Sequence, residues 1–339
     1  MTAGSRRRAP GFFGGEARSD SSDDPVPLWH FLMPPHWRAW MLIGWLRLAA
    51  ALPWSWSLTL HRRLGAWLGG MSRRSARLVD ENLARCFPDI SSTERAALAR
   101  EYFANMGAFA SEIALAWFGS RSRVRALFEV EGLKNLECGL AGGRGVILCA
   151  GHFTPIELAS VAVADYAPRY ALLYNKRRSR LLSEFQRRSR TRYTDAVFEK
   201  RNLRAVLRSL RANSVVWFSA DEAHTGKASV LIPFFGEPAL TNTSLSRLAR
   251  ISGARLVPLF FCRRPDGSGY RLRFEPPLEG FPSEDVVADT RRLVALLENQ
   301  VRECPTQYFW KQRRFRLRRG GTELGDRQAE KSNNPMTGT

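Results

Sequence analysis

The stretch Gly145-Val-Ile-Leu-Cys-Ala-Gly-His-Phe-Thr-Pro-Ile-Glu157 predicts a buried strand, a sharp turn and the start of a helix. Residues 146–150 are continuously apolar, as in a strand that is covered on both faces, and Gly151 permits the turn that ends it. Pro155 suits the first turn of a helix, where its missing N–H would have no partner. We therefore expect His152 at the carboxyl end of a strand and Glu157 at the start of the following helix.

Two interpretations of this histidine and glutamate are open. In the first, Glu157 bonds to one imidazole nitrogen of His152, which fixes the tautomer and lets the other nitrogen take a proton from a hydroxyl. In the second, His152 caps the helix and Glu157 is solvated. The rest of the chain has to decide between a catalytic pair and a helix terminus.

Composition points to an anionic partner. The chain has 339 residues, 44% of them apolar, which is enough for one large domain with an appendage. Its 52 Lys and Arg against 32 Asp and Glu give a net charge of +20, which favours nucleic acid, an anionic membrane surface or an acidic carrier protein. The ten tryptophans and twenty phenylalanines favour a membrane interface. The five scattered cysteines lack metal-ligand spacing and indicate a reducing, cytoplasmic compartment, so we expect no metal and no cofactor.

The chain divides into five segments by composition. We expect a disordered N-terminus over 1–27, a membrane-anchoring helical segment over 28–70, a helical region over 71–130, a catalytic α/β domain over 131–318 and a flexible tail over 319–339.

The tryptophan-rich segment 28–70 predicts a helix that lies in, or dips into, the cytoplasmic leaflet. Its longest apolar part, residues 39–60, is interrupted by Arg47 and broken by Pro53. A membrane span needs ~20 apolar residues, so this part is marginal as a span. An ordinary buried amphipathic helix is the alternative.

From residue 131 onward, short apolar stretches alternate with amphipathic ones. We expect strands at 145–150, 170–174, 215–219, 230–234, 256–261 and 270–274, and helices at 155–165, 179–190, 201–211, 242–252 and 284–302. This alternation predicts an α/β fold with a largely parallel sheet flanked by helices. Ligands of such sheets lie beyond the carboxyl ends of strands, where His152 is expected.

Basic residues gather in two stretches, 176–192 and 311–319. Guanidinium groups bind phosphate bidentately, which fits phospholipid headgroups or a phosphorylated glycolipid. Nucleic acid is the competing interpretation, although no recognisable nucleic-acid motif accompanies these stretches. Asp221 and Lys227 follow the expected strand 215–219, so they either line the same crevice as His152 or shape a turn.

Residues 151–157 resemble the His-x4-Asp/Glu signature of glycerolipid acyltransferases. Over residues 35 to 318 the chain is more specifically similar to the bacterial lipid A late acyltransferases, the lauroyl and myristoyl enzymes that add secondary acyl chains to the lipopolysaccharide anchor. The segments that carry this similarity are Glu81–Pro88, Val230–Gly236, Leu248–Pro258 and Gln307–Phe315.

The resemblance implies a glycerolipid-acyltransferase-like fold and a membrane-associated O-acyltransferase on the cytoplasmic face of the bacterial inner membrane. His152 would deprotonate the acceptor hydroxyl, and Glu157 would orient and charge-balance it. The donor would be the thioester of an acyl carrier protein, and the acceptor a phosphorylated glycolipid among the membrane lipids. Neither a cofactor nor nucleic acid belongs to this scheme.

The chain departs from the family pattern after the second expected strand. Where such enzymes usually show Tyr-Arg-Pro, this chain has Tyr174-Asn-Lys-Arg-Arg178, so an arginine that could hold an oxyanion or a phosphate is displaced. That substrate-binding role then falls to Lys176 or Arg177. Two alternatives stay open: acyl transfer to another lipid, such as a phosphatidylinositol mannoside or an aminolipid, and a non-catalytic basic protein that binds membranes or nucleic acid.

Overall fold

The computed structural model describes residues 26–174, 179–199, 202–219, 221 and 229–315. Lys176, Arg177 and Lys227 lie outside the described residues, as do residues 1–25 and the tail 319–339.

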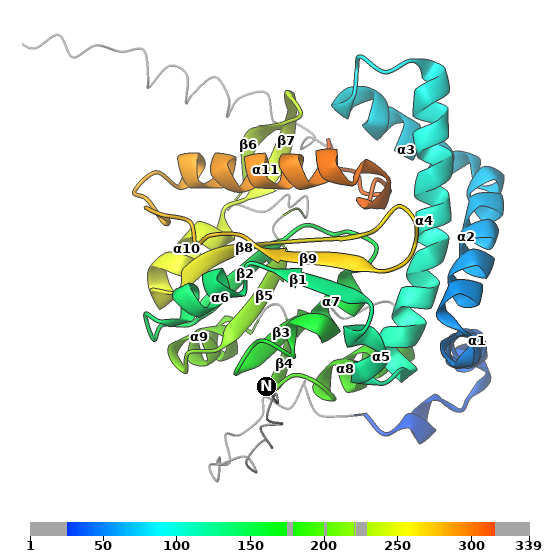
Figure 1. Cartoon of the computed structure of the whole chain (residues 1–339), viewed down its shortest axis with the longest axis horizontal. Coiled ribbons are helices and arrows are strands. Elements are labelled where there is room, and N and C mark those ends of the chain that lie inside the picture. The colour runs from blue at the N-terminus through cyan, green and yellow to red at the C-terminus, as the bar shows by residue number, and fades with distance from the viewer. Residues whose placement is uncertain (1–25, 175–178, 200–201, 220, 222–228, 316–339) are drawn as a thin grey trace, which may run out of the picture.

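Seven strands in the described part of the chain form one sheet (Figure 1). In spatial order they are β1 (Phe128–Glu131), β9 (Tyr270–Phe274), β8 (Arg255–Arg263), β2 (Val146–Ala150), β5 (Val215–Ser219), β3 (Tyr170–Tyr174) and β4 (Ala196–Glu199). Only the β8–β9 pair is antiparallel, and all other neighbours are parallel. The predicted α/β fold with a largely parallel sheet is therefore confirmed.

Helices cover both faces of the sheet because the central strand has apolar residues on both. In β2, Val146, Leu148 and Ala150 join a core cluster with helices on one side, whereas Ile147 and Cys149 join a second cluster. The first cluster includes α6 (Leu133–Leu140) and α7 (Ile156–Val163), and the second includes α9 (Leu203–Arg211) and α10 (Ser244–Ser252). Burial on both faces explains why residues 146–150 are apolar without alternation.

Two further helices flank this core. They are α8 (Arg180–Thr191), which contacts β4, and α11 (Val286–Glu303), which packs on a separate hairpin. That hairpin pairs β6 (Ser229–Phe234) with β7 (Glu237–Asn242). The expected strand at 230–234 therefore exists but lies outside the main sheet. Its turn contains Gly236, whose φ of +82° is a left-handed conformation that glycine adopts without strain.

The N-terminal region, residues 28–125, is helical and packs against one end of the sheet. Short turns η1 (Leu28–Phe31) and η2 (Pro34–His36) lead into α1 (Trp37–Ala51), α2 (Trp54–Met71), α3 (Arg73–Cys86), α4 (Ser92–Phe118) and α5 (Arg121–Arg125). Pro53 separates α1 from α2, as its position predicted. A capping box between Ser91 and Glu94 begins α4, which lies between α2 and the sheet (Figure 1).

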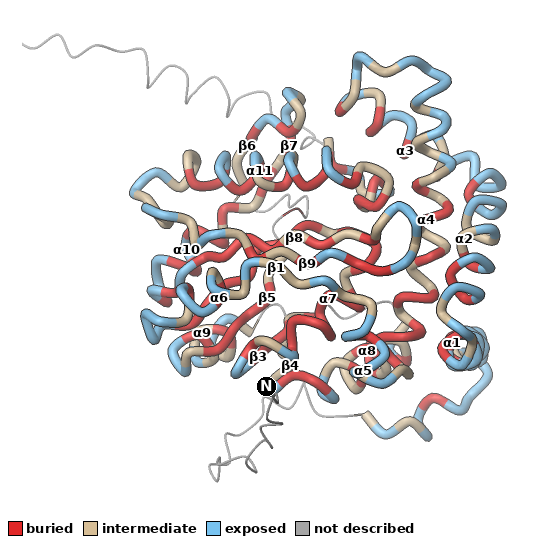
Figure 2. The backbone as a smooth tube through the Cα atoms, viewed as in Figure 1, coloured by how far each residue is buried: buried red, intermediate tan, exposed pale blue. Residues whose placement is uncertain are grey.

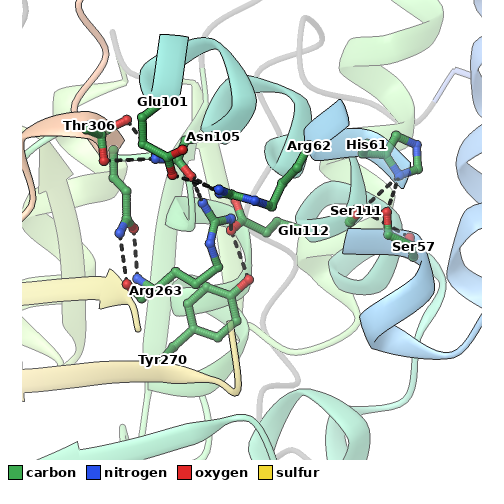
Figure 3. Close-up of polar contacts among 11 residues, drawn as sticks. Ser57, His61, Arg62, Glu101, Asn105, Ser111, Glu112, Arg263, Tyr270 and Thr306 are labelled. Atoms are coloured by element: carbon green, nitrogen blue, oxygen red, sulfur yellow. Dashed lines mark hydrogen bonds and ion pairs between the residues drawn. The ribbon is translucent and has the colours of Figure 1, made fainter. Parts of the chain in front are cut away.

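Two glycines let α2 and α4 approach closely. A Cβ at Gly107 would lie 1.9 Å from the carbonyl oxygen of His61, and one at Gly65 would lie 2.5 Å from the Cα of Gly107. The side chain of His61 then bonds within this contact, with Nδ1 2.8 Å from the Ser57 carbonyl oxygen and 2.9 Å from Ser111 Oγ. Figure 3 shows this group beside a larger polar network.

Many residues of η1, α1 and α2 are exposed to solvent (Figure 2), and many of these exposed side chains are apolar. Most of the exposed large apolar side chains of the described residues lie here: Trp29, Leu32, Met33, Trp37, Met41, Leu42, Trp45, Leu48, Trp56, Leu60, Trp67, Leu68 and Met71. Within the described ranges, no helix combines the length and the apolar character that crossing a bilayer requires.

A buried polar network ties α4 to strands β8 and β9 (Figure 3). Arg263 of β8 donates to Glu112 of α4 at 2.7 Å and also to Asn105. Tyr270 of β9 donates to the same Glu112 oxygen at 2.9 Å. Asn105 in turn donates to the carbonyl and hydroxyl oxygens of Thr306 at 3.1 and 2.9 Å. The network therefore fixes η3 (Pro305–Gln307), the turn that follows α11.

Candidate active site

His152 and Asp221 meet because two neighbouring parallel strands end in register. Ala150 and Ser219 are the last residues of β2 and β5, and they are paired. His152 and Asp221 each follow two residues farther along, so both lie beyond the same edge of the sheet. This carboxyl edge is where open α/β sheets bind their ligands.

The carboxylate of Asp221 holds His152 by two contacts. Oδ1 lies 2.5 Å from the imidazole Nδ1, and Oδ2 accepts the backbone N–H of His152 at 2.8 Å. Burial alone would raise the pKa of the Asp221 carboxyl, but the charge of His152 and its two hydrogen bonds outweigh burial, and the pKa is lowered. An ionised carboxylate only accepts hydrogen bonds, so Nδ1 is the donor in this contact, and in the neutral form of the ring Nε2 then has the lone pair of a base.

The turn that carries His152 is fixed by its neighbours. A Cβ at Gly151 would lie 2.5 Å from a methyl carbon of Leu297 and 2.7 Å from the ring of Phe153, so a larger residue here would have to displace these side chains. Phe153 forms a β-bridge with Tyr308. The N–H of Phe309 donates to the carbonyl oxygen of His152 at 3.0 Å, and the two rings lie 6.1 Å apart. The segment after η3 thus holds the histidine backbone in place.

Glu157 bonds to the neighbouring helix α8. Its Oε1 accepts hydrogen bonds from Gln186 and from Arg190, both at 2.6 Å and both from α8. Because Glu157 lies in the first turn of α7, its carboxylate reaches the neighbouring helix, and Asp221 occupies the position at Nδ1 of His152. At Nδ1 of His152 the structure therefore places Asp221, where the sequence led us to expect Glu157.

A cavity of about 360 Å³ opens beside His152. One part of its lining is polar: Glu157, Ser160, Gln186 and Arg190. The other part is apolar and comes from α4, α7, the ends of β3 and β5 and the C-terminal segment: Phe109, Ile156, Leu172, Leu173, Trp217, Phe218 and Phe309. An imidazole at the boundary between a charged wall and an apolar wall suits a reaction that joins a polar group to a hydrocarbon chain.

Three arginines of the first basic stretch pair with acidic side chains of the fold. Arg187 and Arg188 bond to Glu184, and Arg190 bonds to Glu157. Burial opposes the charge of Arg190, but Glu157 outweighs burial and raises the pKa of the guanidinium. A count of charges along the sequence could not show these pairs. Arg187 and Arg188 reach Glu184 only because all three lie on one helix, and Arg190 reaches Glu157 on a different helix.

A sequence profile of the bacterial lipid A biosynthesis acyltransferases matches residues 26–317. The chain belongs to this family. Three relatives support the assignment across most of both chains. The lipid A biosynthesis palmitoleoyltransferase of Escherichia coli (strain K12) is 34% identical over 85% of this chain and 94% of its own length. The lauroyltransferase of the same organism is 32% identical, over 86% and 95%.

The lipid A biosynthesis myristoyltransferase of Escherichia coli (strain K12) is 24% identical, over 86% of this chain and 90% of its own length. A lipid A biosynthesis acyltransferase is an enzyme, so this protein is an acyltransferase and the alternative of a non-catalytic binding protein is set aside. The three relatives are named for three different acyl groups. Family membership therefore does not fix the length of the acyl chain that this protein transfers.

Proposed function

We propose that this lipid A biosynthesis acyltransferase transfers a fatty acyl chain from the thioester of an acyl carrier protein to a hydroxyl of a lipid A precursor, with His152 as general base. The observation that carries the proposal is the Asp221–His152 pair at the mouth of a half-apolar cavity. The Asp221 carboxylate holds the imidazole in the tautomer in which Nε2 accepts a proton, and it stabilises the imidazolium that forms.

The reaction needs one proton carrier. Nε2 of His152 takes the proton of the acceptor hydroxyl while the hydroxyl oxygen attacks the thioester carbon. The tetrahedral intermediate then collapses, the carbon–sulfur bond breaks, and the imidazolium returns its proton to the departing thiolate. Burial raises the pKa of the nearby Cys149 thiol to about 12, so it stays protonated and is a poor nucleophile. Direct transfer to the acceptor hydroxyl is therefore the simpler route.

We propose that Glu157 shapes the cavity and does not exchange the proton. Its bonds to Gln186 and Arg190 connect α7 to α8 across the cavity wall. A buried guanidinium paired in this way holds its position, so the polar wall keeps a fixed shape during turnover. The residues expected to bind substrate, Lys176, Arg177 and Lys227, keep that role as a prediction.

We propose further that the apolar face of η1, α1 and α2 lies on the membrane. Exposed indoles such as Trp56 and Trp67 are 71% and 64% accessible, far above what a side chain in a packed core shows. Tryptophan rings of this kind sit at the headgroup level of a bilayer, and interfacial helices bury one apolar face there. Such docking, on the cytoplasmic face of the inner membrane, would bring a lipid acceptor to the edge of the sheet.

Replacing the two residues of the pair tests the mechanism. We expect His152→Ala and Asp221→Asn each to lower kcat by a factor on the order of 10² to 10⁴, the usual contribution of a positioned base. The double variant should be no slower than His152→Ala, because Asp221 acts through the imidazole. Circular dichroism and urea unfolding would confirm that the variants fold. Near-normal turnover by folded His152→Ala would contradict the mechanism.

The acceptor is tested separately. Purified enzyme would be given a lipid A precursor, a phosphatidylinositol mannoside and an aminolipid side by side, with one acyl carrier protein thioester as donor. We expect mass spectrometry to find the added acyl chain on the lipid A precursor. Acylation of another lipid alone would refute this acceptor and leave the proposal for His152 intact.

A further inference from the structure

A groove lined by cations lies between α3 and the segment that follows η3. We call it the basic groove, and its charged residues are Arg74, Arg77, Glu81, Arg85, Lys311 and Arg313. Its volume is about 720 Å³, and all five cations are exposed. Its acid, Glu81, pairs with Arg77 at 2.9 Å. Among the described residues, no acidic side chain pairs with Arg74, Arg85, Lys311 or Arg313, so the groove has a strong excess of positive charge.

Contacts between α3 and the C-terminal segment fix the shape of the basic groove. Asn82 of α3 donates to the carbonyl oxygens of Trp310 and Gln312 at 2.7 and 2.8 Å, which fixes the C-terminal segment against α3. The guanidinium of Arg85 lies over the ring of Phe315, 5.3 Å from its centre. A cation over an aromatic face is held in place without losing its charge.

The same segment reaches the active site. Phe309 bonds to His152, and Arg313 follows only four residues later, a backbone distance of at most about 14 Å. The hydroxyl of Tyr102 accepts the N–H of Lys311 at 3.2 Å, so the segment is also fixed between these two ends. A partner in the basic groove would therefore sit beside the cavity of His152, within reach of a flexible arm that carries a thioester.

We propose that the basic groove is the docking surface for the acidic acyl carrier protein, an inference that rests on the donor proposed above. Exposed cations that lack acidic partners attract an acidic protein and steer its approach.

Position favours a carrier protein over a lipid headgroup. In the view of Figure 1, α3 and the orange segment after α11 lie on one side of α4, and α2 lies on the other. The exposed tryptophans belong to η1, α1 and α2. The apolar face would therefore meet the membrane, and the basic groove, on the other side of α4, would bind a different partner.

Charge reversal with a matched control tests the docking surface. The test variant is Arg74→Glu/Arg85→Glu/Lys311→Glu. The control is Arg204→Glu/Arg208→Glu/Arg211→Glu, which changes the net charge equally at exposed residues of α9, far from the groove. Steady-state kinetics would use the full chain in detergent micelles at low salt, with an acyl carrier protein thioester or the matching acyl-pantetheine as donor.

We expect the groove variant to raise KM for the carrier protein at least tenfold, with kcat, KM for the acceptor and turnover of acyl-pantetheine unchanged. The control should shift KM for the carrier protein less than twofold. Added salt should weaken wild-type binding to the carrier protein much more than it weakens binding by the groove variant. If the triple variant unfolds, Arg74→Ala/Lys311→Ala provides the same comparison with a smaller expected change, about threefold.

Three other results would overturn the proposal. An unchanged KM for the carrier protein in a folded groove variant would show that the donor docks elsewhere. A raised KM for the acceptor, with weaker binding to phosphatidylglycerol vesicles than the control variant shows, would assign the groove to a lipid headgroup. Wild-type enzyme that uses acyl-pantetheine or acyl-CoA but not the carrier protein would refute the proposed donor itself, and the docking proposal with it.

Discussion

At the residue scale, two buried carboxylates near the cavity hold different partners. Asp221 contacts Nδ1 of His152, and Glu157 contacts Arg190 and Gln186. The pH dependence of catalysis separates their roles. Asp221→Asn should lower kcat and also shift the acid limb of the rate profile, because the imidazolium loses its counter-ion. Glu157→Gln should lower kcat without moving that limb. A pH profile of kcat/KM for both variants, normalised to folded enzyme, checks this difference, and an acid limb displaced only by Glu157→Gln would reverse the assignment.

The lowered pKa of Asp221 also predicts an effect on stability. Its folded pKa lies below the ordinary value of 3.8, so its contribution to stability is complete above that value and is lost as the pH falls through the folded pKa. Wild-type free energy of unfolding should therefore fall more steeply than that of Asp221→Asn once the pH drops below about 4, by at most about 1.4 kcal/mol per pH unit for one proton. Urea unfolding across this range tests the sign, and parallel curves for the two proteins would contradict it.

The sequence located His152 because a local pattern marks the end of a buried strand. It could not supply the contact between His152 and Asp221, because β3 and β4 intervene in the chain between β2 and β5, which are neighbours in the sheet. The sequence shows Asp221 as a polar residue just after an expected strand. Its contact with His152 follows only once β2 and β5 are known to be neighbours in the sheet. Local patterns therefore indicate candidates, and long-range strand pairing decides which of them meet.

At the element scale, helices α7 to α11 lie close to their expected positions, whereas α6 was not expected. Helices α8 to α11 each bury one face, which an amphipathic pattern predicts. The strands β1, β4 and β7 were not expected, and each has a weak signal. The first two have four residues each, none of them fully buried, and they form the edges of the sheet. The third contains Pro238, which lies in a two-stranded hairpin where a missing N–H is tolerated.

The long helix α4 offers a stability test at its N-terminus. Ser91 accepts the N–H of Glu94 at 3.2 Å, and the Glu94 carboxylate accepts both the N–H and the hydroxyl of Ser91 at 2.8 Å. Ser91→Ala removes this reciprocal cap and should lower the free energy of unfolding by about 1 kcal/mol. Ser92→Ala changes the next serine without touching the cap and should stay within about 0.5 kcal/mol of wild type. Equal unfolding curves for the two variants would show that the cap contributes nothing.

At the scale of the whole molecule, a buried ion pair joins the N-terminal helical region to the sheet. Glu112 and Arg263 are almost fully buried and lie on α4 and β8. Glu112→Leu leaves the guanidinium without its carboxylate and should destabilise the protein by about 3 to 5 kcal/mol. Arg264→Met breaks the neighbouring exposed pair with Glu129 and should cost less than about 1 kcal/mol. Guanidinium chloride unfolding of both variants measures the difference. Similar losses in the free energy of unfolding would show that the buried pair contributes no more than the exposed one.

The apolar face formed by η1, α1 and α2 makes the second prediction at this scale. Indoles that leave water for a headgroup region gain free energy, and partial burial of Trp56 and Trp67 should contribute about 1.5 kcal/mol each. Together they should account for about a hundredfold in affinity. We therefore expect Trp56→Ser/Trp67→Ser to bind phosphatidylglycerol-containing vesicles about a hundredfold more weakly in a sedimentation assay, with an unchanged free energy of unfolding because neither ring packs in the core.

Leu203→Ser/Ile251→Ser is the matched control for this face, since both side chains are exposed and lie on α9 and α10, away from the apolar face. It should change vesicle binding less than twofold. Turnover of a water-soluble acceptor analogue should be equal in all three proteins, because neither pair of residues lines the cavity of His152. Loss of turnover only with a bilayer-embedded acceptor would place the defect of the tryptophan variant in docking. Equal vesicle binding by the two variants would contradict a membrane role for Trp56 and Trp67.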